Sequence, residues 1–122
     1  MIDLKLGVVE SRFADIIWKN EPLTTKELTI ICEKELNWKR TTTYTVLKKL
    51  CDRGIFMTKS RIVTSLMTKA EFTAARSEQF VDENYCGSLP AFIAAFTTRK
   101  ALSSEELSEI KNMIKSLEEQ TK

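Results

Sequence analysis

The sequence contains no histidine, and its three glycines and three cysteines are scattered. Without histidine, general acid–base catalysis would fall to carboxylates, lysines or tyrosines, and no Gly-rich phosphate loop is present. No apolar run approaches the ~20 residues that span a bilayer, and the first residues lack the basic and apolar regions of a signal peptide. These absences argue against an enzyme, a bound cofactor and a membrane partner, and they predict a cytoplasmic protein.

The cysteines, Cys32, Cys51 and Cys86, have no paired spacing. Their odd number and the expected reducing compartment argue against a disulfide framework. Cys32 and Cys51 occupy apolar positions of predicted helices, which favours buried packing. Scattered thiols without histidine also argue against a zinc or copper site.

Charge is distributed unevenly along the chain. The net charge is +2, but residues 1–70 hold 13 basic and 8 acidic residues, whereas residues 71–122 hold 6 and 9. Between Lys39 and Arg61 there are seven basic residues and one acid, Asp52. Such a basic patch on a nearly neutral protein points to a localised anionic partner, with an ordinary solvated surface as the alternative.

Three helices are expected in the first half of the chain. An apolar stripe at 3.6-residue spacing predicts a helix from about Val8 to Asn20, which Pro22 ends. The capping box formed by residues 24–27 begins a second helix, which continues to about Leu36. A third helix is predicted over residues 41–53, because Gly54 supplies a left-handed stop.

The third of these helices has two contrasting faces. At 100° per residue, its aliphatic side chains and Thr43 fall on one side. The other side carries hydroxyl and basic side chains: Thr41, Thr42, Tyr44, Thr45, Lys48 and Lys49. Such a face suits a DNA major groove, since hydroxyls reach base edges or phosphates and lysines neutralise phosphate. A solvated helix face is the alternative.

After Gly54 the period of the sequence changes from helical to extended. Residues 55–58 and 62–66 are β-branched or aromatic runs around Lys59-Ser60-Arg61, which predicts a hairpin with a basic tip. Three helices followed by a hairpin are the element order of a winged helix-turn-helix. The predicted fold is therefore mainly α with a small β-hairpin wing (α+β), and residues 1–70 are expected to form a DNA-binding domain.

The remaining residues, 71–122, are expected to form a helical dimerisation region. Helices are predicted from Glu71 to about Tyr85, after the cap Ser88, and after the capping box of Ser103 and Glu106. Their apolar residues exceed what a winged domain needs, so they pack back on the same chain or cover a second copy. We favour a homodimer, because paired reading helices need a rigid dimer element. The expected interface residues are Phe92, Ile93, Phe96, Leu107, Ile110, Ile114 and Leu117.

Several segments also match one known family, in order along the chain. Residues 6–10 with 16–18 resemble an opening helix that carries a Glu and ends in Trp. Trp38, Thr42, residues 45–50 and Gly54 resemble a recognition helix, residues 61–63 a wing, and residues 102–107 the start of a last helix. The chain therefore resembles the penicillinase and methicillin-resistance repressor (BlaI/MecI) family, which also includes copper-responsive repressors. The resemblance implies a dimeric winged-helix repressor that binds a pseudo-palindromic operator in double-stranded DNA.

The residues expected to contact DNA follow from the helix pattern and this resemblance. Basic residues are assigned to the phosphates, and hydroxyl residues of the third helix are assigned to the bases. The first set is Arg40, Lys48, Lys49, Lys59 and Arg61, and the second is Thr41, Thr42, Tyr44 and Thr45. Lys39 is a further basic residue expected to contact DNA. A winged-helix module that binds protein, without specific DNA binding, is the alternative function.

The resemblance also implies a means of inactivation. An antibiotic-triggered protease cuts some members of the family before a Phe in the C-terminal region. The resemblance therefore implies a regulatory protease as a further partner. The matching bond here is Ala95-Phe96, with Ala95 where the well-studied members carry Asn. The paired-cysteine tail of the copper-responsive members is missing from this chain, which disfavours metal sensing.

Overall fold

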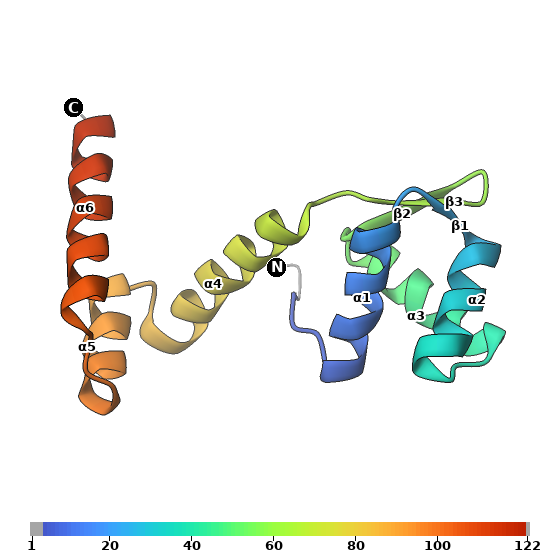
Figure 1. Ribbon diagram of the computed structural model, residues 1–122, viewed down its shortest axis with the longest axis horizontal. Helices are drawn as coiled ribbons and strands as arrows, with labels where there is room; N and C mark the ends of the chain where they lie inside the picture. Colours follow the sequence, from blue (N-terminus) through green and yellow to red (C-terminus); the bar gives the residue numbers. More distant parts are fainter. Residues whose placement is uncertain (1–3, 122) are drawn as a thin grey trace. The chain divides into compact units, whose positions relative to one another are not determined.

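The structure, a computed structural model, describes residues 4–121 (Figure 1). The chain divides into two compact units, one ending at Phe80 and the other beginning at Val81. The division falls inside helix α4 (Lys69–Tyr85). Within the described range, no helix combines the length and the apolar character that a membrane span requires.

The first unit is a winged helix, as the sequence predicts. Its elements are α1 (Val8–Asn20), β1 (Leu23–Thr24), α2 (Thr25–Leu36), α3 (Arg40–Asp52), β2 (Phe56–Lys59), β3 (Ile62–Ser65) and the beginning of α4. The predicted bounds of α1 agree with the structure, and α3 begins and ends one residue earlier than expected. The class, mainly α with a small antiparallel wing, is confirmed.

The wing contains a third strand that the sequence does not reveal. Strand β1 pairs antiparallel with β3, which gives the order β1-β3-β2. Because β1 has two residues, it is too short for an alternating pattern. Its pairing also gives Thr24 two functions, since Thr24 is opposite Ile62 in the sheet while its hydroxyl accepts the Glu27 N–H at 3.0 Å and caps α2.

The core of the first unit lies between the three helices and the sheet. Side chains from α1, α2 and α3 meet Phe56 and Val63 of the sheet and Phe72 of α4. Trp18 packs against both phenylalanines, with ring centroids 5.3 Å from Phe56 and 5.4 Å from Phe72. Its indole N–H donates to the Met67 carbonyl at 3.0 Å, so the polar atom of this aromatic side chain is also satisfied.

The turn between α2 and α3 fixes the start of α3. Asn37 ends α2 in the left-handed region at φ 57°, a conformation that asparagine adopts more readily than most residues. The following Trp38 packs its ring 5.3 Å from that of Phe13 in α1. At the other end, Gly54 takes φ 80° directly after α3, as its expected role as a left-handed stop requires.

The second unit consists of the end of α4, α5 (Leu89–Arg99) and α6 (Ser104–Gln120). Both predicted caps are present: the Ser88 hydroxyl accepts the Ala91 N–H at 3.1 Å, and Ser103 and Glu106 form a reciprocal capping box. Among its described residues, 81–121, none has a buried side chain. These helices are therefore well specified locally but lack a core of their own.

Candidate nucleic-acid interface

The two faces of α3 differ as the sequence predicts. Thr43, Leu47 and Leu50 are buried in the core. The predicted base-reading residues of this helix are all exposed, and so are the basic residues at its beginning and on its outer side: Thr41, Thr42, Tyr44, Thr45, Lys39, Arg40, Lys48 and Lys49. The structure therefore presents the hydroxyl and basic face of α3 to solvent.

The beginning of α3 has an unusual charge distribution for a free helix. Its first turn contains Arg40 and no acidic residue, and the Lys39 side chain before it makes no cap. Helix N-termini carry a partial positive charge that favours anions and disfavours cations. Two cations at this end therefore raise the local positive potential, which an anion such as phosphate would neutralise.

The wing brings a second pair of basic residues to the surface. Lys59 is the last residue of β2 and pairs with Ile62, so the turn itself consists of Ser60 and Arg61. Both have positive φ, 52° and 65°, as in the tight hairpin turns that match the twist of the strands. Lys59, Ser60 and Arg61 are all exposed.

A groove of about 500 Å³ connects α3 with the wing. Its lining includes Tyr44 and Lys48 of the exposed α3 face and Arg61 of the wing tip. Thr25 of α2 and Thr58 of β2 also line it, and neither residue is among those that the sequence pattern predicts for DNA contact. The position of Thr25 as the first residue of α2 is the signal that could have found it, because helix N-termini bind anions.

Lys49 lies apart from this groove. Its ammonium group forms an ion pair with the Glu10 carboxylate of α1 at 3.3 Å. Burial by itself would raise the pKa of Glu10, but the Gly7 N–H bond and the Lys49 charge outweigh it, so this pKa lies below its ordinary value. The assignment of Lys49 to a phosphate contact stays a prediction, and the ion pair gives this side chain a competing partner.

The three cysteines differ in access to solvent. Cys32 is buried, and burial raises the pKa of its thiol to about 11, so it remains a neutral core side chain near pH 7. Cys51 is only partly buried and lies in the groove, where its Sγ is 3.7 Å from Thr58 Oγ1. Cys86 is exposed in the turn before α5. All three are free thiols.

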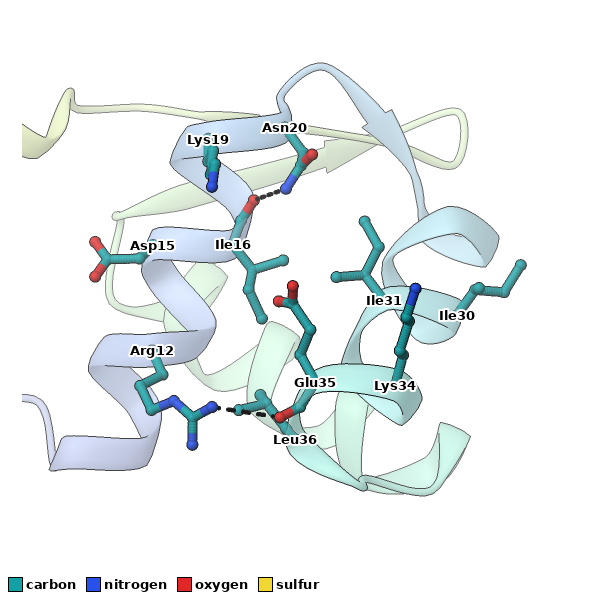
Figure 2. A pocket seen from close by; sticks show the side chains of 10 residues that line it. All are labelled: Arg12, Asp15, Ile16, Lys19, Asn20, Ile30, Ile31, Lys34, Glu35 and Leu36. Carbon is teal, nitrogen blue, oxygen red and sulfur yellow. Dashed lines mark hydrogen bonds between the residues drawn. The ribbon is translucent and has the colours of Figure 1, made fainter.

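A second groove, between α1 and α2, has a different character (Figure 2). Its volume is about 560 Å³, and the buried Ile16 faces Ile31 across it. The Glu35 carboxylate lies between these two side chains, and Arg12 donates to the Glu35 carbonyl at 3.3 Å (Figure 2). Three basic and two acidic side chains line this groove, whereas Lys48 and Arg61 line the groove between α3 and the wing with no acidic residue beside them in the described part of the chain. The groove between α3 and the wing is therefore the better nucleic-acid surface.

The predicted interface residues all lie on the two last helices. Phe92 is half-buried, with its ring 5.5 Å from Tyr85 and 6.1 Å from Phe96. The other six are exposed, and they share this surface with Leu89 and Met113: Ile93, Phe96, Leu107, Ile110, Ile114 and Leu117. Exposed apolar residues this numerous on one small unit are typical of an interaction surface.

The expected cleavage bond lies inside α5. Ala95 and Phe96 are exposed, but their backbone is helical. A protease acts on segments that have opened locally. Cleavage between Ala95 and Phe96 would therefore require α5 to unwind first.

Fold and surface together define a winged-helix protein whose third helix exposes hydroxyl and basic side chains. A comparison with protein families matches residues 6–116 to the penicillinase repressor family. The chain therefore belongs to this family of transcriptional repressors, as the sequence predicts. It is also similar to the penicillinase repressor of Bacillus licheniformis, with 23% identity over 110 residues that cover 87% of this chain and 86% of the relative.

Proposed function

We propose that this protein is a dimeric repressor that binds a pseudo-palindromic operator in double-stranded DNA with α3 and the wing. The observation that carries the proposal is the exposed face of α3, which has hydroxyl and basic side chains, no acid in its first turn, and a groove leading to Arg61. A polyanion supplies what this surface lacks, namely negative charge at the helix N-terminus and along the basic edge.

Base reading is assigned to the hydroxyl residues of α3. The Thr45 hydroxyl donates to the Thr41 carbonyl at 2.9 Å, so its oxygen is left as an acceptor beside its methyl group. An acceptor in the major groove suits the amino groups of adenine and cytosine, and a methyl group suits thymine. Guanine presents only acceptors there, so Thr45 would discriminate against it.

Phosphate contacts are assigned to Lys39 and Arg40 at the start of α3, Lys48 on its outer face, and Lys59 and Arg61 of the wing. Each neutralised phosphate releases counterions, which lowers the logarithm of the binding constant by about 0.9 per unit of log salt concentration. Four or five such contacts per subunit predict steep salt dependence for a dimer.

We also propose a cytoplasmic location, because a repressor acts on chromosomal DNA.

Dimerisation is assigned to α5 and α6. The exposed apolar residues of these helices have no buried counterpart within the described residues of their own unit. A second copy with the same surface would cover them in a two-fold symmetric contact. A regulatory protease that cuts Ala95-Phe96 would remove the residues that follow, including all of α6, and so weaken the dimer.

The test is fluorescence anisotropy with the promoter DNA upstream of the gene that encodes this chain, compared with random duplex, over a series of salt concentrations. We expect specific binding with a steep salt slope. Thr45→Val replaces the hydroxyl by a methyl group and should change which operator bases are preferred, at a cost of ~1–3 kcal/mol for a good base contact. Binding to neither duplex in dilute buffer would contradict the proposal and favour a protein-binding module.

A further inference from the structure

The wing is tied to the rest of the first unit at both ends of β3. At the tip, the Thr25 backbone N–H donates to the Arg61 carbonyl at 2.9 Å. At the base, the Glu21 carboxylate accepts the Ser65 N–H at 2.9 Å and the Ser65 hydroxyl at 2.8 Å. Thr25 is the first residue of α2 and Glu21 directly follows α1, so both helices hold the hairpin.

These bonds have properties that suit a fixed wing. The bonds to Glu21 are assisted by charge, and such bonds are roughly twice as strong as neutral ones. Ser60 and Arg61 both occupy the left-handed region, which costs energy for residues with a side chain and persists where the surroundings hold it. The hydrogen bond from Thr25 to Arg61 helps to hold this conformation, and Arg61 is the wing residue that lines the groove.

We infer that Glu21 and Thr25 are positioning residues for DNA binding: they hold the hairpin so that Arg61 stays beside Lys48 and Tyr44 in the groove. The inference rests on the proposed function, because it gives the wing a contact with DNA. A mobile wing would lose conformational entropy when DNA orders it, whereas a wing that is already fixed avoids this cost. Neither residue needs to touch DNA for this effect.

Thr25→Pro tests the contact at the wing tip, because proline has no backbone N–H to donate to the Arg61 carbonyl. Proline is well accepted at the first position of a helix. The preceding Thr24 has φ −76° and ψ 158°, which a following proline requires. The substitution removes the N–H, and its ring would occupy the place of the Arg61 carbonyl and push the wing tip away. Thr25→Ala is the matched control, since it removes the side chain and keeps the N–H.

The contact at the base of the hairpin is tested by a similar pair of variants. Glu21→Ala removes the hydrogen bonds that the Glu21 carboxylate accepts from the Ser65 N–H and hydroxyl. Glu21→Gln keeps one oxygen for the Ser65 N–H and an amide group for the hydroxyl. Rescue of DNA binding by Glu21→Gln would show that the hydrogen bonds matter and the negative charge does not. Circular dichroism and thermal unfolding check that all variants remain folded.

The decisive readout is coupling to Arg61. With the proposed operator, Thr25→Pro should weaken binding by roughly tenfold per subunit, the size expected for one lost charged hydrogen bond. The salt slope of the dimer should fall by ~1.8, because each subunit loses one phosphate contact at about 0.9 per contact. In an Arg61→Ala background, the same substitution should change neither quantity, because the contact it positions is already gone. Equal effects of Thr25→Pro with and without Arg61 would overturn the inference.

A second measurement separates this inference from the proposed function. Nuclear magnetic relaxation of the free protein should give backbone order parameters near ~0.85 for Ser60 and Arg61, as in rigid segments, and lower values in Thr25→Pro. Values below ~0.6 in the native chain would overturn the inference even if the native chain binds the operator. If the native chain has an ordered wing but binds no duplex, the proposed function fails and the positioning role fails with it.

Discussion

The two units of this chain are built from similar helices but satisfy their apolar side chains differently. In the first unit, α1, α2 and α3 bury residues against one another and against the sheet. In the second, α5 and α6 have good caps and an apolar seam, yet the described residues 81–121 include no buried side chain. Local helix signals and a closed core are therefore independent properties, and the proposed dimer would supply the core that the second unit lacks.

The charges differ in the same way. The first helical turn of α6 carries Glu105 and Glu106, which complement its N-terminus, whereas the first turn of α3 has a cation and no acid. The helix that is expected to meet another copy is thus stabilised by its own sequence, and the helix that is expected to meet DNA leaves its positive end for the ligand.

The first prediction concerns the core of the first unit. Leu50 is fully buried, so Leu50→Ala should lower the free energy of unfolding by ~2–5 kcal/mol. Both tryptophans, Trp18 and Trp38, lie in this unit, so denaturation followed by tryptophan fluorescence reports on it selectively. Leu117→Ala, 57% exposed in the second unit, is the matched control and should leave this transition nearly unchanged. A similar loss for both variants would mean that the units unfold together.

The second prediction concerns the second unit. Ile114→Glu places a charge in the middle of the expected interface and should weaken the dimer by about a hundredfold or more, because the charge would be buried without a partner. Asn112→Glu adds the same charge elsewhere on α6 and should have little effect. Analytical ultracentrifugation over a concentration series measures both. Should Ile114→Glu remain as dimeric as the native chain, the interface would have to lie elsewhere.

How far the sequence predicts the molecule also differs between the units. The period of apolar residues predicts α1 to within its observed bounds, and Ser88, Ser103 and Glu106 predict the caps of the last helices. These features depend on residues that are close in sequence. Other features depend on contacts between residues far apart in sequence, which no local pattern records. They are the strand β1, the hydrogen bonds that hold the wing at Arg61 and Ser65, and the ion pair of Lys49.

The candidate site shows the same limit. The exposed face of α3 could be predicted, because burial of Thr43, Leu47 and Leu50 follows from helix periodicity. The groove to the wing could not, because its lining includes Thr25 and Thr58, which come from two other elements. Periodicity finds which side chains share a face, whereas the topology decides which faces meet.

The third prediction compares two neighbouring lysines. The sequence assigns Lys48 and Lys49 to phosphate, whereas the structure gives Lys49 an ion pair with Glu10. We expect Lys48→Ala to weaken binding to all duplexes alike and to reduce the salt slope by about 0.9 per subunit, which is ~1.8 for the dimer. Lys49→Ala should leave the slope unchanged and cost less than about 1 kcal/mol of unfolding free energy, since the lysine is half exposed. Equal slopes for both variants would restore Lys49 to the phosphate contacts.

The smallest effect is expected from acid. Hydrogen bonds from backbone N–H groups hold the pKa of Glu106 below its ordinary value, and the pKa of Glu10 is also lowered although its burial opposes this. A carboxyl group with a lowered pKa in the folded state stabilises the fold above its unfolded pKa, about 4.3, and this contribution disappears as the pH falls through the folded value. Both units should therefore lose stability on acidification below that pH.

Glutamine variants assign this loss to each unit. Glu106→Gln preserves the capping box, since glutamine accepts the same N–H, but removes its titration. In that variant, acid should change the helical circular dichroism less, with no difference in tryptophan fluorescence. Glu10→Gln should instead weaken the acid dependence of the tryptophan signal, together with the part of the circular dichroism that comes from α1, α2 and α3, because Glu10 holds α1 to α3 inside the first unit. If Glu106→Gln altered the acid dependence of the tryptophan signal, the two units would be energetically coupled, because both tryptophans lie in the first unit and Glu106 lies in the second.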